Sequence, residues 1–64
     1  MAGGVMVGIL RECHKDHIVL ENGTKIFLTD KQNASGLSPG TSVTVAYTAK
    51  SDGRKVADNI WLGR

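Results

Sequence analysis

The sequence predicts an all-β protein that folds as a small barrel of five strands. Apolar residues recur along the chain with a period of two rather than 3.6, which is typical of strands and not of helices. Two pairs that favour hairpin turns, Asn22-Gly23 and Asp52-Gly53, lie between apolar runs. A chain of 64 residues has room for one domain, which we expect to span residues 1–64.

The first strand is predicted over about residues 5–13. Two sets of apolar residues alternate at its start, and because side chains alternate across a strand, the sets lie on opposite faces: Val5, Val7 and Ile9 against Met6, Gly8 and Leu10. A polar break at residues 14–16 ends this strand.

The second and third strands form a hairpin around Asn22-Gly23. This pair predicts a two-residue type I′ turn, which needs a positive φ at both central positions. Phe27 then faces outward with Lys25 beside it, because the alternation assigns four aliphatic residues to the inner face: Ile18, Leu20, Ile26 and Leu28.

A 12-residue connection separates the third strand from the fourth. We expect Asp30 to cap a single helical turn over residues 31–34, because Asp is a favoured N-cap. Leu37 is expected to close one end of the barrel, and Pro39-Gly40 to turn the chain into the next strand.

The last two strands form a second hairpin around Asp52-Gly53. The inner face of the fourth strand is predicted to carry Val43, Val45 and Tyr47. The fifth strand is predicted over about residues 54–62, with Val56, Ile60 and Leu62 on its inner face. Asp58 has the same parity, so a bulge near residues 57–59 is predicted, because one extra residue exchanges the two faces.

Five strands in this order, with a long connection after the third, fit two architectures. The OB-fold is a five-stranded Greek-key barrel, and its helix lies between the third and fourth strands. An SH3-like barrel has similar strands with different connections. The long connection favours the OB-fold, and the SH3-like barrel stays open as the alternative.

Two segments resemble the bacterial translation initiation factor one family, whose members are S1-like OB-folds that bind RNA. They are residues 19–23 (Val-Leu-Glu-Asn-Gly) and residues 37–45 (Leu-Ser-Pro-Gly-Thr-Ser-Val-Thr-Val), followed by Thr48 and Gly53-Arg54; Gly8 fits loosely. The family's basic connection is not matched, because residues 30–38 contain a single lysine, Lys31. The layout also resembles small uncharacterised bacterial β-barrel proteins. The first resemblance implies RNA binding, and the second implies the fold alone.

Charge and composition exclude several function classes. The net charge of +2 and the pI near 9.0 permit an anionic partner without demanding one, because the basic residues are spread along the chain. No apolar run is long enough to span a membrane, and a lone Cys13 fits a reducing compartment. We therefore expect a cytoplasmic location and no membrane partner. A phosphate-binding loop and a catalytic carboxylate pair are both missing, so no enzymatic activity and no cofactor are expected.

The best candidate for a metal-binding cluster in the sequence consists of Cys13, His14 and His17. Cysteine and histidine are ligands of zinc, and three of them with an open position describe a catalytic zinc site. The Cys-His-x-x-His spacing matches no recognised zinc motif, and neighbouring residues of a strand point to opposite faces. We prefer the interpretation that both histidines are solvated beside a turn, and keep the metal site as an alternative.

Aromatic and basic residues predict the functional surface. Phe27 and Trp61 both face outward if Ile26 and Ile60 face the core, and the third and fifth strands meet where an OB barrel closes. We expect the two rings to stack on the bases of single-stranded nucleic acid, RNA in particular, while Lys25, Arg54 and Lys55 contact phosphates.

Two other interpretations of the same residues stay open. An exposed apolar patch on a small domain also fits a protein partner or a homo-oligomer, and Trp is a frequent hot-spot residue in interfaces. Alternatively, Trp61 folds over the end of the barrel and completes the core.

Overall fold

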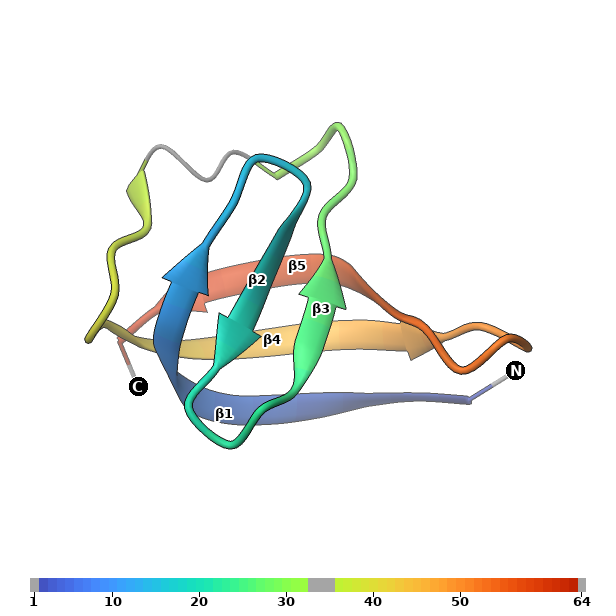
Figure 1. Ribbon diagram of the computed structural model, residues 1–64. Coiled ribbons are helices and arrows are strands. Elements are labelled where there is room, and N and C mark those ends of the chain that lie inside the picture. Colours follow the sequence, from blue (N-terminus) through green and yellow to red (C-terminus); the bar gives the residue numbers. More distant parts are fainter. Residues whose placement is uncertain (1, 33–35, 64) are drawn as a thin grey trace.

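The computed structural model describes residues 2–32 and 36–63 and contains a closed barrel of five strands (Figure 1). The strands are β1 (Ala2–Cys13), β2 (His17–Leu20), β3 (Lys25–Phe27), β4 (Ser42–Ala49) and β5 (Lys55–Leu62). The predicted all-β class and the five-stranded barrel are confirmed. β1 begins earlier than predicted, because its first residues pair with the end of β4, where Ala2 lies opposite Ala49.

The strands follow the order β1-β2-β3-β5-β4 around the barrel. β4, β1, β2 and β3 are therefore consecutive neighbours, which is the 4-1-2-3 arrangement of a Greek key. β5 closes the barrel between β3 and β4 and runs parallel to β3. A closed five-stranded barrel is compatible with both predicted alternatives, and the Greek-key order favours the OB-fold.

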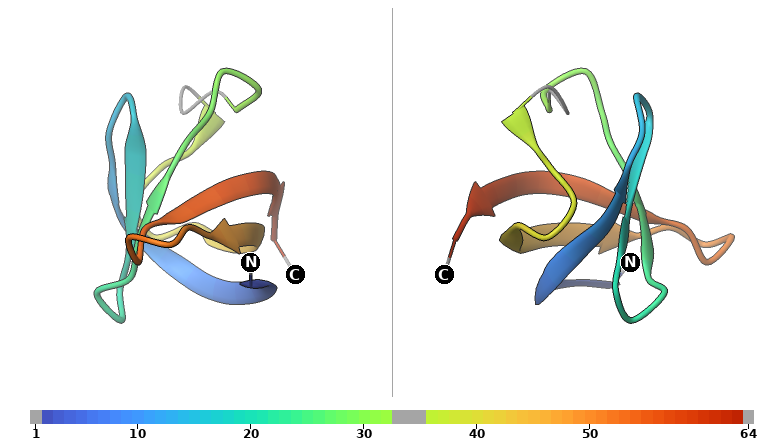
Figure 2. Two further views of the ribbon diagram at one scale, coloured as in Figure 1. Left: turned by 90° about the vertical axis from the view of Figure 1, so that its right-hand side faces the viewer. Right: turned by 60° about the vertical axis from the view of Figure 1, so that its left-hand side comes forward.

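β1 takes part in both halves of the barrel. Residues 2–9 pair with β4, and the residues from Leu10 onward pair with β2, with an irregularity between Leu10 and Glu12. β2, β3 and the end of β1 consequently stand steeply against the long strands β4 and β5 (Figures 1 and 2). The first part of β1, β4 and β5 form one sheet, and β2 and β3 cross it.

Every strand contributes to the core. The fully buried side chains are all aliphatic: Leu10, Ile18, Leu20, Ile26, Val43, Val45 and Ala57. Those of β2, β3 and β4 match the predicted inner faces. Leu28, Leu37, Tyr47 and Ile60 are partly buried against this cluster, as predicted. Leu62 is 60% exposed and does not join the core, because it lies at the very end of β5.

The hairpin between β2 and β3 has the predicted inner faces, but its turn and pairing differ from those of a two-residue loop, which would pair Ile18 with Phe27. Ile18 pairs with Ile26, but among the described residues only glycines have a positive φ, so Asn22 does not and a type I′ turn is wrong. Gly23, with φ 92°, donates its N–H to the Leu20 carbonyl (2.9 Å) and completes a three-residue loop. The side chain of Asn22 accepts the N–H of Thr24 (2.9 Å), which stabilises this loop.

The hairpin between β4 and β5 repeats the same turn. Gly53 has φ 91° and donates its N–H to the Lys50 carbonyl (3.0 Å), while Asp52 Oδ1 accepts the N–H of Arg54 (3.0 Å). The prediction of a hairpin at Asp52-Gly53 is confirmed.

The predicted bulge in β5 is also confirmed. Ala46 pairs with Asn59 and Tyr47 with Ala57, so Asp58 is the extra residue. The carboxylate of Asp58 accepts the Thr48 hydroxyl (2.7 Å) and stays outside the core. The bulge places Ala57 inside, so the prediction that Val56 faces inward is wrong.

The connection after β3 starts with a cap that differs from the prediction. Thr29 donates its N–H to Gln32 Oε1 (2.8 Å), and its hydroxyl accepts the N–H of Lys31 (3.3 Å), so Thr29 and not Asp30 caps the turn. A Thr with a Gln three residues later is the pairing of a capping box. The rest of the predicted helical turn, Asn33 and Ala34, lies outside the described residues.

Candidate nucleic-acid interface

Phe27 is the centre of the candidate interface. Its neighbour Ile26 is fully buried, so the ring of Phe27 lies on the outer face of β3, where the residue is half-buried. The hairpin register sets His17 beside it on β2, and the parallel pairing sets Val56 beside it on β5. The predicted outward orientation of Phe27 is confirmed.

Two cations lie over the Phe27 ring. Lys25 Nζ is 4.9 Å from the ring centroid, and Arg54 Cζ is 5.5 Å from it, both within the range of a cation–π contact. Arg54 comes from the β4–β5 turn, where its Nε donates to Asp52 Oδ2 (2.9 Å). The structure therefore brings together three of the predicted residues from two distant segments of the chain.

Two histidine rings extend this aromatic surface, and the sequence did not lead us to expect them there. The rings of His14 and His17 are stacked, with centroids 4.4 Å apart and an interplanar angle of 21°. The centroid of His17 is in turn 6.0 Å from that of Phe27. The signal was available, because the inner positions predicted for Ile18 and Ile26 leave both His17 and Phe27 on the outer face of the hairpin.

Carboxylates hold both histidines in place. His17 Nδ1 is hydrogen-bonded to Asp16 Oδ1 (2.7 Å), and His14 Nε2 to Glu12 Oε1 (2.8 Å). These hydrogen bonds lower the pKa of Asp16 and the pKa of Glu12 below their ordinary values. The surface is consequently aromatic and mixed in charge rather than uniformly basic.

The metal alternative is not supported by the geometry. Among residues 2–32 and 36–63, no group of three His, Cys, Asp or Glu side chains is arranged to hold a metal ion. Cys13 pairs with the buried Ile18 and packs against the core, and burial raises the pKa of its thiol. His14 and His17 stack outside, so the three candidate ligands do not converge.

The remaining predicted site residues lie elsewhere. Lys55 Nζ is 5.9 Å from the ring centroid of Tyr47 rather than over Phe27. Trp61 pairs with Thr44, five residues beyond Val56, which is roughly 15 Å along an extended strand. The expectation that Phe27 and Trp61 share one patch is wrong, because β3 is short and meets only the start of β5.

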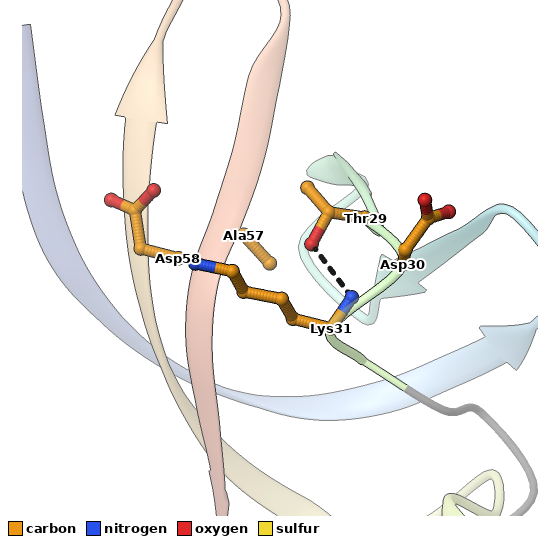
Figure 3. Close-up of a pocket in the computed structure, with 5 residues that line it drawn as sticks. All are labelled: Thr29, Asp30, Lys31, Ala57 and Asp58. Atoms are coloured by element: carbon orange, nitrogen blue, oxygen red, sulfur yellow. Dashed lines mark hydrogen bonds between the residues drawn. The ribbon is translucent and has the colours of Figure 1, made fainter.

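A pocket of about 360 Å³ lies beside this surface, between the residues that follow β3 and the bulge of β5 (Figure 3). It is lined by Thr29, Asp30, Lys31, Ala57 and Asp58. The side chain of Lys31 extends across the pocket toward β5, while the carboxylate of Asp30 points away from it. Two carboxylates and one amine make a poor site for a phosphate, so we do not assign the pocket to the interface.

Comparison of the chain with models of protein families, with curated proteins and with solved structures finds no match. Within the part of the chain that the structure describes, no helix has the length and apolar character needed to cross a membrane.

Proposed function

We propose that this protein binds single-stranded nucleic acid on the outer face of β2 and β3, without enzymatic activity. The observation that carries the proposal is the grouping of Phe27 with Lys25, Arg54 and the stacked histidines. In OB-folds this face, together with the β1–β2 and β4–β5 loops, is where oligonucleotides bind. Here His14 belongs to the first of those loops and Arg54 to the second.

The chemistry of the surface suits a single strand. A base stacks on the Phe27 ring or on the exposed His14 ring, and stacking contributes roughly 1–3 kcal/mol per base whatever the base. Lys25 and Arg54 move from the ring to the phosphates that flank the stacked base. RNA is favoured over DNA by the resemblance of the two turn segments to the initiation factor family.

A titration with a mixed oligonucleotide pool, followed by amide chemical shifts at low salt, tests the proposal. We expect the shifts to gather on β2, β3 and the two adjoining loops. Phe27→Ala is expected to weaken binding roughly 5- to 150-fold, the equivalent of one lost stack. Lys25→Ala is expected to reduce the slope of log K against log salt by about 0.7, the value for one phosphate contact with a single strand.

Two matched variants serve as controls. Trp61→Ala removes an aromatic ring outside the interface, and Lys55→Ala removes an amine that lies over Tyr47. Both are expected to change affinity much less than Phe27→Ala and Lys25→Ala. The proposal is wrong if no amide shifts occur at low salt, or if Trp61→Ala weakens binding more than Phe27→Ala does.

A further inference from the structure

The outer face of the sheet formed by β1, β4 and β5 is apolar, and nothing in the proposed nucleic-acid interface uses it. Val5 is 68% exposed, Val7 59%, Ile9 42% and Trp61 49%. Val7, Thr44 and Trp61 form one row across the three strands, because Val7 pairs with Thr44 and Thr44 pairs with Trp61. Val5 and Ile9 lie in the rows on either side of it. We call this surface the β1–β4–β5 face and define it by Val5, Val7, Ile9, Thr44 and Trp61.

The rows that define the β1–β4–β5 face contain no charged side chain, and the carboxylate of Asp58 lies at their edge, where it accepts the Thr48 hydroxyl. No charged residue occurs in residues 2–10 or 41–49, and the outward residues of β5 in these rows are Asn59 and Trp61. The basic and histidine side chains that line the nucleic-acid surface lie around Phe27 instead. An uncharged apolar face fits a second uncharged apolar face, so two copies of this chain meet no electrostatic obstacle there.

We propose that the β1–β4–β5 face is the interface of a symmetric homodimer. The four large side chains expose on the order of 400 Å² in each copy, or about 800 Å² in a pair. Homodimer interfaces are about 65% apolar, so about 800 Å² of apolar area corresponds to a total buried area of roughly 1,200 Å². This total is the lower end of the range for specific interfaces. A barrel this small has a limited core, and self-association is a usual source of added stability.

The arrangement of large and small residues is self-complementary. Trp61 on β5 and Val7 on β1 are bulky, and Thr44 on β4 between them is smaller. When two copies stack face to face, a twofold axis that runs parallel to β4 between them places β5 of each copy over β1 of the other. Trp61 of each copy then lies over Val7 of the other. The same contact is then made twice, as an isologous interface requires.

The single tryptophan makes the dimer directly observable. Trp61 is the one Trp of the chain, so its emission reports on this face alone. With rising protein concentration we expect the emission maximum to shift to the blue and, over the same range, the mass by sedimentation equilibrium to rise from 6.8 kDa to twice that value. A monomeric mass up to millimolar concentration overturns the proposal.

Variants locate the interface. Val7→Lys is expected to weaken dimerisation by roughly tenfold or more, because it buries an unpaired charge. The double variant Val5→Thr with Val7→Thr keeps the β-branched shape of both side chains and makes them more polar. It is also expected to weaken dimerisation, and it serves as the test if Val7→Lys fails to fold. Phe27→Ala is the control and is expected to leave the dimer intact. A dimer that both face variants leave unchanged uses another surface and refutes the proposal.

This outcome is independent of the nucleic-acid proposal. Loss of oligonucleotide binding in Phe27→Ala with an intact dimer supports both. A dimer that forms through the β1–β4–β5 face, in a protein that binds no oligonucleotide, supports the interface and refutes the function.

Discussion

Replacing Gly8 by alanine tests how closely β1 approaches the core side chains of β2. Gly8 lies on the inner face of β1, opposite Val43. A Cβ atom built at this position lies 2.9 Å from Cδ1 of Leu20. Leu20 is only 1% exposed and packs within the core, so its side chain has little room to move away.

The expected magnitude follows from two opposing contributions. Overpacking a filled core costs roughly 1–3 kcal/mol. Replacing a glycine within a strand by alanine contributes about 0.5–1 kcal/mol in the other direction, through the lower entropy of the unfolded chain. We therefore expect Gly8→Ala to destabilise the protein by about 1 kcal/mol, which corresponds to roughly 4–8 °C in Tm for a domain of this size.

Urea unfolding in a double-mutant cycle measures the contact itself. Leu20→Val shortens the side chain that the new methyl group meets, so Gly8→Ala is expected to cost less, or to stabilise, in that background. Gly36→Ala is the matched control, because no heavy atom lies within 4 Å of its added Cβ, and it is expected to change stability by less than about 0.5 kcal/mol. Equal effects of Gly8→Ala in both backgrounds would refute the reasoning.

Two further predictions concern the turns. Gly23→Ala places a side chain at φ 92° and is expected to lower the free energy of unfolding by about 1–2 kcal/mol; Gly23→Asn is expected to cost less, and equal urea midpoints for the two variants would contradict the strain argument. The hydrogen bond from the Arg54 backbone lowers the pKa of Asp52 in the folded state. The ionised carboxylate therefore stabilises the folded protein at pH values above the unfolded pKa of Asp52, and this contribution is lost as the pH falls through the folded pKa. The stability difference between the wild type and Asp52→Asn should therefore shrink as urea unfolding is repeated from pH 6 down to pH 3, and a constant difference would exclude this linkage.

Local patterns in the sequence were sufficient for much of the barrel. Alternation assigned Ile18, Leu20, Ile26, Val43 and Val45 to the core, and all five are buried. The bulge followed from Asp58 alone, because a carboxylate cannot replace an aliphatic side chain on an inner face without a shift of register. The inner faces of the hairpin at Asn22-Gly23 were correct and its turn type was wrong, because the observed loop has three residues and pairs Ile18 with Ile26, whereas a two-residue loop would pair Ile18 with Phe27.

The candidate site was predicted only in part. Lys25 and Phe27 are two residues apart on one face of a strand, so their proximity is a local property. The contact of Arg54 with Phe27, the stack of His14 on His17 and the distance of Trp61 from Phe27 depend on how strands distant in the sequence pair.

Local patterns were enough to place the strands, the inner faces of the second, third and fourth strands and the outward position of Phe27, because strand periodicity and turn chemistry act over a few residues. Which surface each aromatic residue joins depends on how the strands pair around the barrel. β3 meets the first residues of β5 in parallel, and β4 pairs along the rest of β5, so Phe27 and Trp61 lie on separate surfaces. Barrel closure, a contact between segments about thirty residues apart, makes that division, and no local pattern encodes it.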